Sequence, residues 1–135
     1  MPLTILLNGA KGRMGQAIAA AAAGPGVVIG ASTDAGDDPA ASLGRCDVII
    51  DFSSPAATGS LLELAVAHRK PIVIGTTGHD TGEKKKLLAL AARTPCVWAG
   101  NFSVGVNLLF ALTEEAARVL AVSYTHLTLP TKRIV

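Results

Sequence analysis

Gly9-Ala10-Lys11-Gly12-Arg13-Met14-Gly15 follows the short apolar run 3–7 and opens the alanine-rich segment 13–23. A short apolar run closed by glycines is typical of a buried parallel strand, and the alanines favour a helix. In such a unit Gly9 permits the tight turn, Gly12 lets a pyrophosphate approach the backbone, and Gly15 lets the helix pack closely. The stretch therefore predicts a phosphate-binding turn at a helix N-terminus, and a glycine turn that serves only packing is the alternative.

The rest of the chain alternates short apolar runs with helical segments. Strands are expected at 27–31, 47–52, 71–74 and 95–99, and helices at 55–68, from 81 onward, and at 104–120. Ser54, Thr81 and Ser103 are the expected N-caps, with Pro55 at the first helical position. This alternation predicts an α/β fold, a Rossmann-like doubly wound parallel sheet, in a single domain over residues 1–121.

An acidic residue stands at the end of the second expected strand. In dinucleotide sites a carboxylate about twenty residues past the glycines binds the adenosine ribose hydroxyls, and Asp34 fits that role. An ordinary turn carboxylate before Gly36 is the alternative. Ala35, Asp37 and Asp38 follow without a nearby cation, so a 2′-phosphate would meet like charge. The sequence favours NAD over NADP.

Three more loops follow expected strands at their carboxyl ends, the edge where ligands bind in such sheets. The loops begin at Phe52-Ser53, at Gly75-Thr76-Thr77-Gly78 and at Gly100-Asn101-Phe102-Ser103. We expect the N–H groups and hydroxyls of the second loop to point into a cofactor crevice, and the loops to converge where a nicotinamide lies. His79 is expected to be a solvated loop residue, with an acid–base role as the alternative, and His68 is expected to end a helix.

Composition and charge exclude several other classes of protein. The 135 residues are 50% hydrophobic with a net charge of +2 and scattered basic residues, which argues against nucleic acid or an acidic membrane as partner. Cys46 and Cys96 lack metal-ligand spacing and are expected to be buried, reduced thiols. The sequence shows no metal-binding cluster. No apolar run is long enough for a membrane span or a signal peptide, so we expect a cytoplasmic protein.

Four motifs together resemble the 4-hydroxy-tetrahydrodipicolinate (dihydrodipicolinate) reductase family: 9–15, Asp51-Phe52-Ser53, 75–78 and Asn101-Phe102-Ser103-Val104-Gly105-Val106-Asn107. The resemblance covers roughly residues 3–120. It implies hydride transfer from a reduced nicotinamide to a cyclic imine or its hydrated precursor, in the diaminopimelate route to lysine. It also implies a cofactor site made of Gly9, Ala10, Lys11, Gly12, Arg13 and Met14 at the pyrophosphate, Asp34 at the ribose, and Gly75, Thr76, Thr77, Ala99, Gly100, Asn101 and Phe102 at the nicotinamide.

The chain departs from the family in two respects. Many members carry an arginine for NADP after the ribose-binding acid, where this chain has Ala35. The family's second domain holds a His-His…Lys acid set and a Ser-Gly-Thr substrate grip, and His126 and Lys132 do not reproduce that pattern. No residue is therefore assigned a catalytic role, and the chain is expected to bind dinucleotide weakly and to catalyse nothing. The resemblance implies a homotetrameric parent, assembled through the second domain.

Two readings from other classes stay open. One is a stand-alone nucleotide-binding or redox-sensing module, and the other is the cofactor domain of a different dehydrogenase, of the aspartate or homoserine type.

The composition of the chain changes abruptly at Val122-Ser123-Tyr124-Thr125-His126-Leu127-Thr128-Leu129-Pro130-Thr131. Back-translated in one frame, this peptide resembles a transposase adapter used for sequencing libraries, which predicts a non-native tail over 122–135. A strand over 123–129 leading to a second domain is the alternative.

Overall fold

The computed structural model describes residues 1–123, and the chain divides into two compact units, Met1–Gly100 and Asn101–Val135. The first unit contains β1 (Leu3–Asn8), α1 (Arg13–Ala21), β2 (Val27–Thr33), α2 (Ala40–Leu43), β3 (Val48–Asp51), α3 (Pro55–Ala67), β4 (Ile72–Ile74), α4 (Thr81–Ala91) and β5 (Cys96–Trp98). The second unit contains α5 (Val104–Ser123). The predicted α/β alternation is confirmed. The proposed non-native tail lies outside the described residues from 124 onward.

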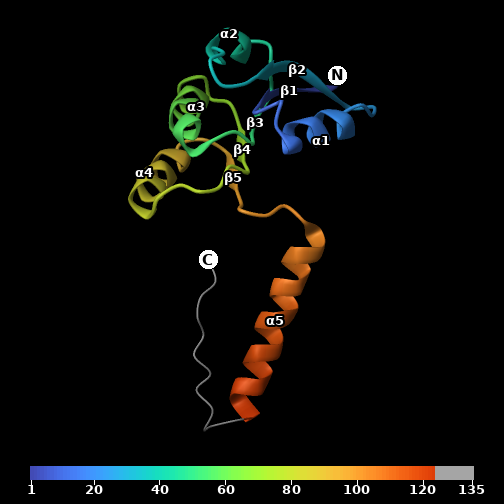
Figure 1. Ribbon diagram of the computed structural model, residues 1–135, viewed down its shortest axis with the longest axis vertical. Helices are drawn as coiled ribbons and strands as arrows, with labels where there is room; N and C mark the ends of the chain where they lie inside the picture. The colour runs from blue at the N-terminus through green and yellow to red at the C-terminus, as the bar shows by residue number, and fades with distance from the viewer. Residues whose placement is uncertain (124–135) are drawn as a thin grey trace. The chain divides into compact units, whose positions relative to one another are not determined.

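The five strands form one parallel sheet in the order β2-β1-β3-β4-β5. From β1 the chain moves outward to β2, then crosses back and continues in the other direction through β3, β4 and β5 (Figure 1). The direction of winding therefore reverses between β1 and β3. In open α/β sheets the carboxyl ends of the strands at such a reversal border the ligand crevice.

The main cluster of buried apolar side chains lies on one face of the sheet. Leu6, Ile49, Ile72 and Ile74 have almost no exposed surface and pack with residues of α2, α3 and α4. Helix α1 lies on the opposite face (Figure 1). The fold is thus doubly wound, as predicted, and it buries one face more completely than the other, since Val97 on β5 is 56% exposed.

The helix N-termini differ from the predicted caps in two places. Thr81 is wrong as the cap of α4, because Asp80 precedes the first helical turn and its Oδ1 accepts from the N–H groups of Gly82 and Glu83. Ser54 occupies the N-cap position of α3, but its side chain makes no capping bond. Ser103 fits the prediction, since its Oγ accepts from the N–H of Val106. A carboxylate outcompetes a hydroxyl next to it for the same free amides.

Helix α3 ends in a Schellman motif that forces a non-glycine residue into the left-handed region. His68 is the C-cap, as predicted, and Arg69 has φ of +53° while Lys70 N–H donates to the Ala65 carbonyl. Glycine is the usual residue at this position, because a Cβ there costs roughly 1–2 kcal/mol.

We therefore expect Arg69→Gly to raise the free energy of unfolding by about 0.5–1 kcal/mol, the net of relieved strain and added unfolded-state entropy. Arg93→Gly is the matched control, since Arg93 also follows a helix, is exposed and has no positive φ. Urea unfolding midpoints compare the two. Equal shifts in the two variants would contradict this account of Arg69.

The two thiols differ in burial. Cys46 is 1% exposed, as predicted, whereas Cys96 on β5 is only half-buried. Burial raises the pKa of both thiols, and for Cys46 nearby Arg45 and Lys70 oppose the shift. A raised pKa lowers the thiolate fraction at neutral pH, so both thiols should alkylate slowly in the folded protein and faster as the pH rises. Iodoacetamide labelling should reach Cys96 before Cys46, and the reverse order would contradict the burial.

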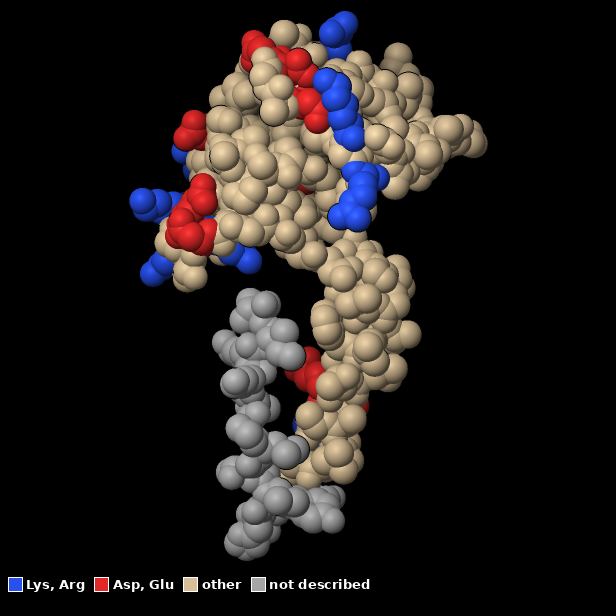
Figure 2. Space-filling model, viewed as in Figure 1, with Lys and Arg blue, Asp and Glu red and all other residues tan. Residues whose placement is uncertain are grey.

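Figure 2 shows the charged side chains on one face of the first unit. On the face drawn in Figure 2, Lys and Arg lie apart from one another and among acidic residues, with no continuous basic patch on that face. Within residues 1–123, no helix combines the length and the apolar character that crossing a bilayer requires.

Candidate functional site

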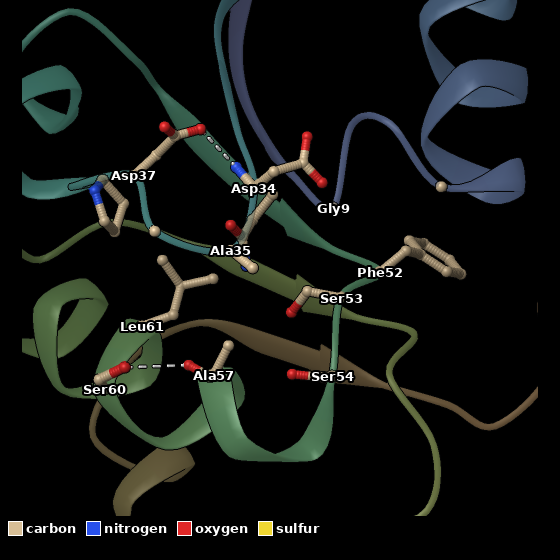
Figure 3. A pocket seen from close by; sticks show the side chains of 14 residues that line it. Gly9, Asp34, Ala35, Asp37, Phe52, Ser53, Ser54, Ala57, Ser60 and Leu61 are labelled. Carbon is tan, nitrogen blue, oxygen red and sulfur yellow. Dashed lines mark hydrogen bonds between the residues drawn. The ribbon is translucent and has the colours of Figure 1, made fainter.

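A cavity of about 340 Å³ opens at the carboxyl ends of β1, β2 and β3 (Figure 3). The glycine turn and the segment after β2 form one side, and the start of α3 forms the other. Its lining residues are Asn8, Gly9, Gly12, Asp34, Ala35, Gly36, Asp37, Pro39, Phe52, Ser53, Ser54, Ala57, Ser60 and Leu61. Three residues expected to bind the cofactor, Gly9, Gly12 and Asp34, therefore border one cavity at the point where the winding reverses.

The glycine turn is compressed between β3 and α1. Gly9 has φ of +82°, and a Cβ on it would lie 2.3 Å from the Phe52 carbonyl oxygen. A Cβ on Gly15 would lie 2.2 Å from the Gly9 carbonyl oxygen and 2.6 Å from Ala10 Cα. Side chains at these two positions would push the turn away from the strand ends. The geometry thus agrees with the predicted tight turn and close helix packing.

The free amides of this turn are fewer than the sequence suggested. The N–H groups of Gly9 and Ala10 both donate to the Thr33 carbonyl, and Gly12 N–H donates to the Gly9 carbonyl. The donors left for a ligand are those of the first turn of α1, beginning at Arg13 and Met14, because no described side chain caps this helix. An uncapped helix start with its positive dipole end is a favourable place for an anion.

Asp34 ties the end of β2 to the glycine turn. Its Oδ2 accepts from Lys11 N–H at 3.0 Å, so the carboxylate is anchored while it borders the cavity. Asp37 folds back so that its Oδ2 accepts from Asp34 N–H at 2.9 Å, the dashed contact between these two residues in Figure 3. Among the described residues that line the cavity, two at this end carry carboxylates and none is Lys or Arg.

The loop after β4 is organised differently from the prediction. Thr76 is only 4% exposed, and its hydroxyl contacts Asp51 Oδ2 at 3.0 Å instead of pointing into the crevice. Gly75 N–H donates to the Asp51 carbonyl. A Cβ on Gly75 would lie 2.2 Å from the Phe52 ring, so the ring packs directly against this glycine. Of this loop's predicted residues, Thr77 is the one whose side chain is exposed. The Gly75 N–H and the Thr76 hydroxyl are therefore engaged beneath the loop, and the cofactor roles of Gly75, Thr76 and Thr77 stay predictions.

The predicted nicotinamide residues do not border the described cavity. Ala99 is half-buried, with its N–H bonded to the Ile74 carbonyl, and Gly100 is exposed. Asn101 and Phe102 belong to the second unit, where Asn101 Oδ1 accepts from Ser103 N–H and its carbonyl accepts from Asn107 Nδ2. These bonds build the start of α5. The nicotinamide roles of residues 99–102 stay predictions.

His79 is not the solvated loop residue that was expected. Its ring is half-buried and packs edge-on against Trp98, with centroids 5.0 Å apart and planes at 74°. Its Nε2 has no hydrogen-bond partner among the described residues. Neither His79 nor Trp98 borders the cavity described above. Residues 1–123 contain no group of three or more His, Cys, Asp or Glu side chains placed to hold a metal ion.

Sequence reasoning placed Phe52 and Ser53 at the ligand-binding edge and gave Ser54 only the role of a cap. It missed Ala57 and the buried Asp51. Ser53, Ser54 and Ala57 border the cavity, and Asp51 lies buried under it with no exposed surface. One signal was present, because an aspartate at the next-to-last position of the run 47–52 needs partners if that run is a buried strand.

The reversal point of the sheet carries a glycine turn, the uncapped start of a helix and a carboxylate that follows a strand. This combination defines a Rossmann-like α/β domain. A sequence profile described as "Dihydrodipicolinate reductase, N-terminus" matches residues 3–102. The chain belongs to this family.

Known relatives agree in sequence and in fold. The chain is 49% identical over 119 residues to a 4-hydroxy-tetrahydrodipicolinate reductase of Akkermansia muciniphila, covering 87% of this chain and 48% of that protein. It is 39% identical over 136 residues to the Xanthomonas campestris protein of the same name, covering 86% and 55%. A dipicolinate-bound dihydrodipicolinate reductase from Paenisporosarcina sp. superposes with a TM-score of 0.68 at 19% identity, covering 87% and 54%. The chain spans about half the length of the curated relatives it matches.

Proposed function

We propose that the chain binds a nicotinamide dinucleotide as the cofactor half of a 4-hydroxy-tetrahydrodipicolinate reductase. The observation that carries the proposal is the cavity that joins the glycine turn, the uncapped start of α1 and Asp34 at the reversal point of the sheet. The chemistry of these groups fits the cofactor, because amide donors suit a pyrophosphate and a carboxylate suits ribose hydroxyls.

Each part of the site would have a distinct task. The first-turn amides of α1 hold the pyrophosphate, Asp34 accepts from the adenosine ribose, and the adenosine half occupies the cavity against α3. A reduced nicotinamide, when bound, supplies the hydride, and the proposed acceptor is a cyclic imine in the diaminopimelate route. The protein contributes position and electrostatics, and the cofactor contributes the redox chemistry.

We propose a preference for NADH over NADPH. The support is the paired carboxylates of Asp34 and Asp37 at the ribose end, together with Ala35 and Gly36 between them. A 2′-phosphate placed there would meet two like charges and no cation among the cavity's lining residues.

Titration with NADH and NADPH, followed by cofactor fluorescence, tests both proposals. We expect saturable NADH binding, weaker NADPH binding, and displacement of NADH by NAD. Absence of saturable binding of either dinucleotide would overturn the proposed function. Tighter NADPH than NADH binding would overturn only the preference.

The complete reaction is proposed for a longer protein. The support is that the curated relatives are about twice the matched length and that the acid set of the resemblance is absent from this sequence. We therefore propose that the 135-residue chain is inactive alone. We further propose a cytoplasmic homotetramer as the parent, on the family resemblance, and a non-native tail over 122–135, on the abrupt change of composition there. Sequencing the source DNA through codons 120–135 tests the last point, and an identical genomic tail followed by a stop would refute it.

A further inference from the structure

A buried carboxylate lies directly beneath the candidate site. Asp51, the last residue of β3, is 0% exposed and does not border the cavity. Its Oδ1 accepts from Asn8 Nδ2 at 2.9 Å and from the Ser53 hydroxyl. Its Oδ2 accepts from the hydroxyls of Thr58 at 2.9 Å and Thr76 at 3.0 Å. Both oxygens are thus fully used by neutral donors, which offsets the cost of burying the group.

The two carboxylate oxygens hold opposite sides of the reversal point. Oδ1 binds Asn8 on β1, and Asn8 Oδ1 in turn accepts from the Thr33 hydroxyl on β2 at 2.9 Å. Oδ2 binds Thr76 after β4, whose hydroxyl also accepts from Ser53 N–H at 3.0 Å. One side chain therefore connects the ends of strands that belong to the two windings of the sheet.

Three members of this network end strands and immediately precede a residue that borders the cavity, and a fourth, Thr76, lies in the loop after β4. Asn8 precedes Gly9, Thr33 precedes Asp34, Asp51 precedes Phe52, and Thr76 precedes Thr77. Asn8, Thr33 and Thr76 are 7%, 5% and 4% exposed, and their polar side-chain groups are bonded within the network. A displacement of any network member would move its loop residue with it.

We propose that Asp51 is a positioning residue for dinucleotide binding, which sets the relative positions of the four strand ends that carry the cofactor loops. It acts through Asn8, Ser53 and Thr76 and does not touch the cofactor. This inference rests on the proposed function, because it assigns the network a role in that same site.

Asp51→Asn tests the positioning role with little change in shape. The side-chain nitrogen of asparagine cannot accept a hydrogen bond. One of the two carboxylate oxygens is thereby replaced by a donor, and the two groups bonded to it lose their acceptor while the side-chain volume is kept. We expect NADH affinity to fall at least about tenfold in a variant that remains folded, by analogy with misplacement of binding groups elsewhere.

A threonine pair separates positioning from general stability, and keeps the test valid if Asp51→Asn does not fold. Thr76→Val and Thr94→Val each remove one buried hydroxyl with little change in volume, and Thr94 bonds the Lys70 carbonyl away from the site. We expect Thr76→Val to weaken NADH binding about tenfold, Thr94→Val to leave it unchanged at a similar unfolding midpoint, and Thr76→Ser to restore it.

The outcomes distinguish the inference from the proposed function. If the unsubstituted 135-residue chain does not bind NADH, the proposed function fails. If it binds and folded Thr76→Val binds equally well, the positioning role fails while the function stands. Equal losses of affinity in Thr76→Val and Thr94→Val would assign the effect to stability and overturn the inference.

Discussion

Replacing Gly9 with alanine is expected to lower the free energy of unfolding by about 2–5 kcal/mol. The backbone cost of a Cβ at φ of +82° adds to a collision with the Phe52 carbonyl oxygen at 2.3 Å. Neither atom can move cheaply, because Phe52 N–H is bonded to the Asn8 carbonyl at the end of the sheet. Urea unfolding followed by circular dichroism measures the loss.

Three other glycines separate the two causes. Gly26 has φ of +99° with nothing within 4 Å of its Cβ position, Gly15 has the collision without a positive φ, and Gly24 has neither. We expect Gly9→Ala to be the most destabilising, Gly15→Ala and Gly26→Ala to be intermediate, and Gly24→Ala to be close to neutral. A Gly15→Ala variant more stable than the unsubstituted protein would show that helix propensity outweighs the collision at α1.

Asp34→Ala should weaken NADH binding by about 1.5–3 kcal/mol, or roughly ten- to a hundredfold, since charged acceptors make the stronger hydrogen bonds. The loss has two sources, because Asp34 also anchors Lys11 N–H in the glycine turn. Asp34→Asn should retain part of the affinity, since an amide oxygen can still accept that bond. Fluorescence titration of the folded variants measures both.

Asp47→Ala is the matched control for Asp34. Asp47 is exposed, and its Oδ2 accepts from the backbone N–H of Thr4 at 2.8 Å. Unlike Asp34, it does not border the cavity. NADH affinity should be unchanged in Asp47→Ala even if the protein is less stable. Unchanged affinity in Asp34→Ala would remove Asp34 from the ribose site.

Local patterns were sufficient to predict the five strands of the first unit and three of its four helices. The apolar runs, the glycines and Pro55 mark strands and helices whose observed ends differ little from those expected. Where the ends differ, pairing decides them: β2 extends to Thr33 because Ser32 and Thr33 pair with Leu7 and Asn8 on β1. The short helix α2 was missed, since the segment 37–46 carries little periodicity.

The side-chain roles were less predictable, because they depend on groups far apart in sequence. Thr76 looks like a loop hydroxyl until Asp51 is placed beneath it, and His79 looks solvated until Trp98 is placed beside it. The glycine-turn amides were expected to be free, but the Thr33 carbonyl occupies two of them. Asp80 and Thr81 are both residues that can cap a helix. The sequence cannot decide which of them is the N-cap until the first residue of α4 is known.

The contacts of Asp51 also set an order for the folding of the chain. Along the chain, Asp51 is separated from Asn8 by 43 positions, from Thr76 by 25 and from Thr58 by seven. Closing such loops carries an entropic cost that grows with their length, so the long-range contacts follow the local ones. During synthesis, the edge of the sheet that carries the glycine turn stays incomplete until residue 76 has left the ribosome.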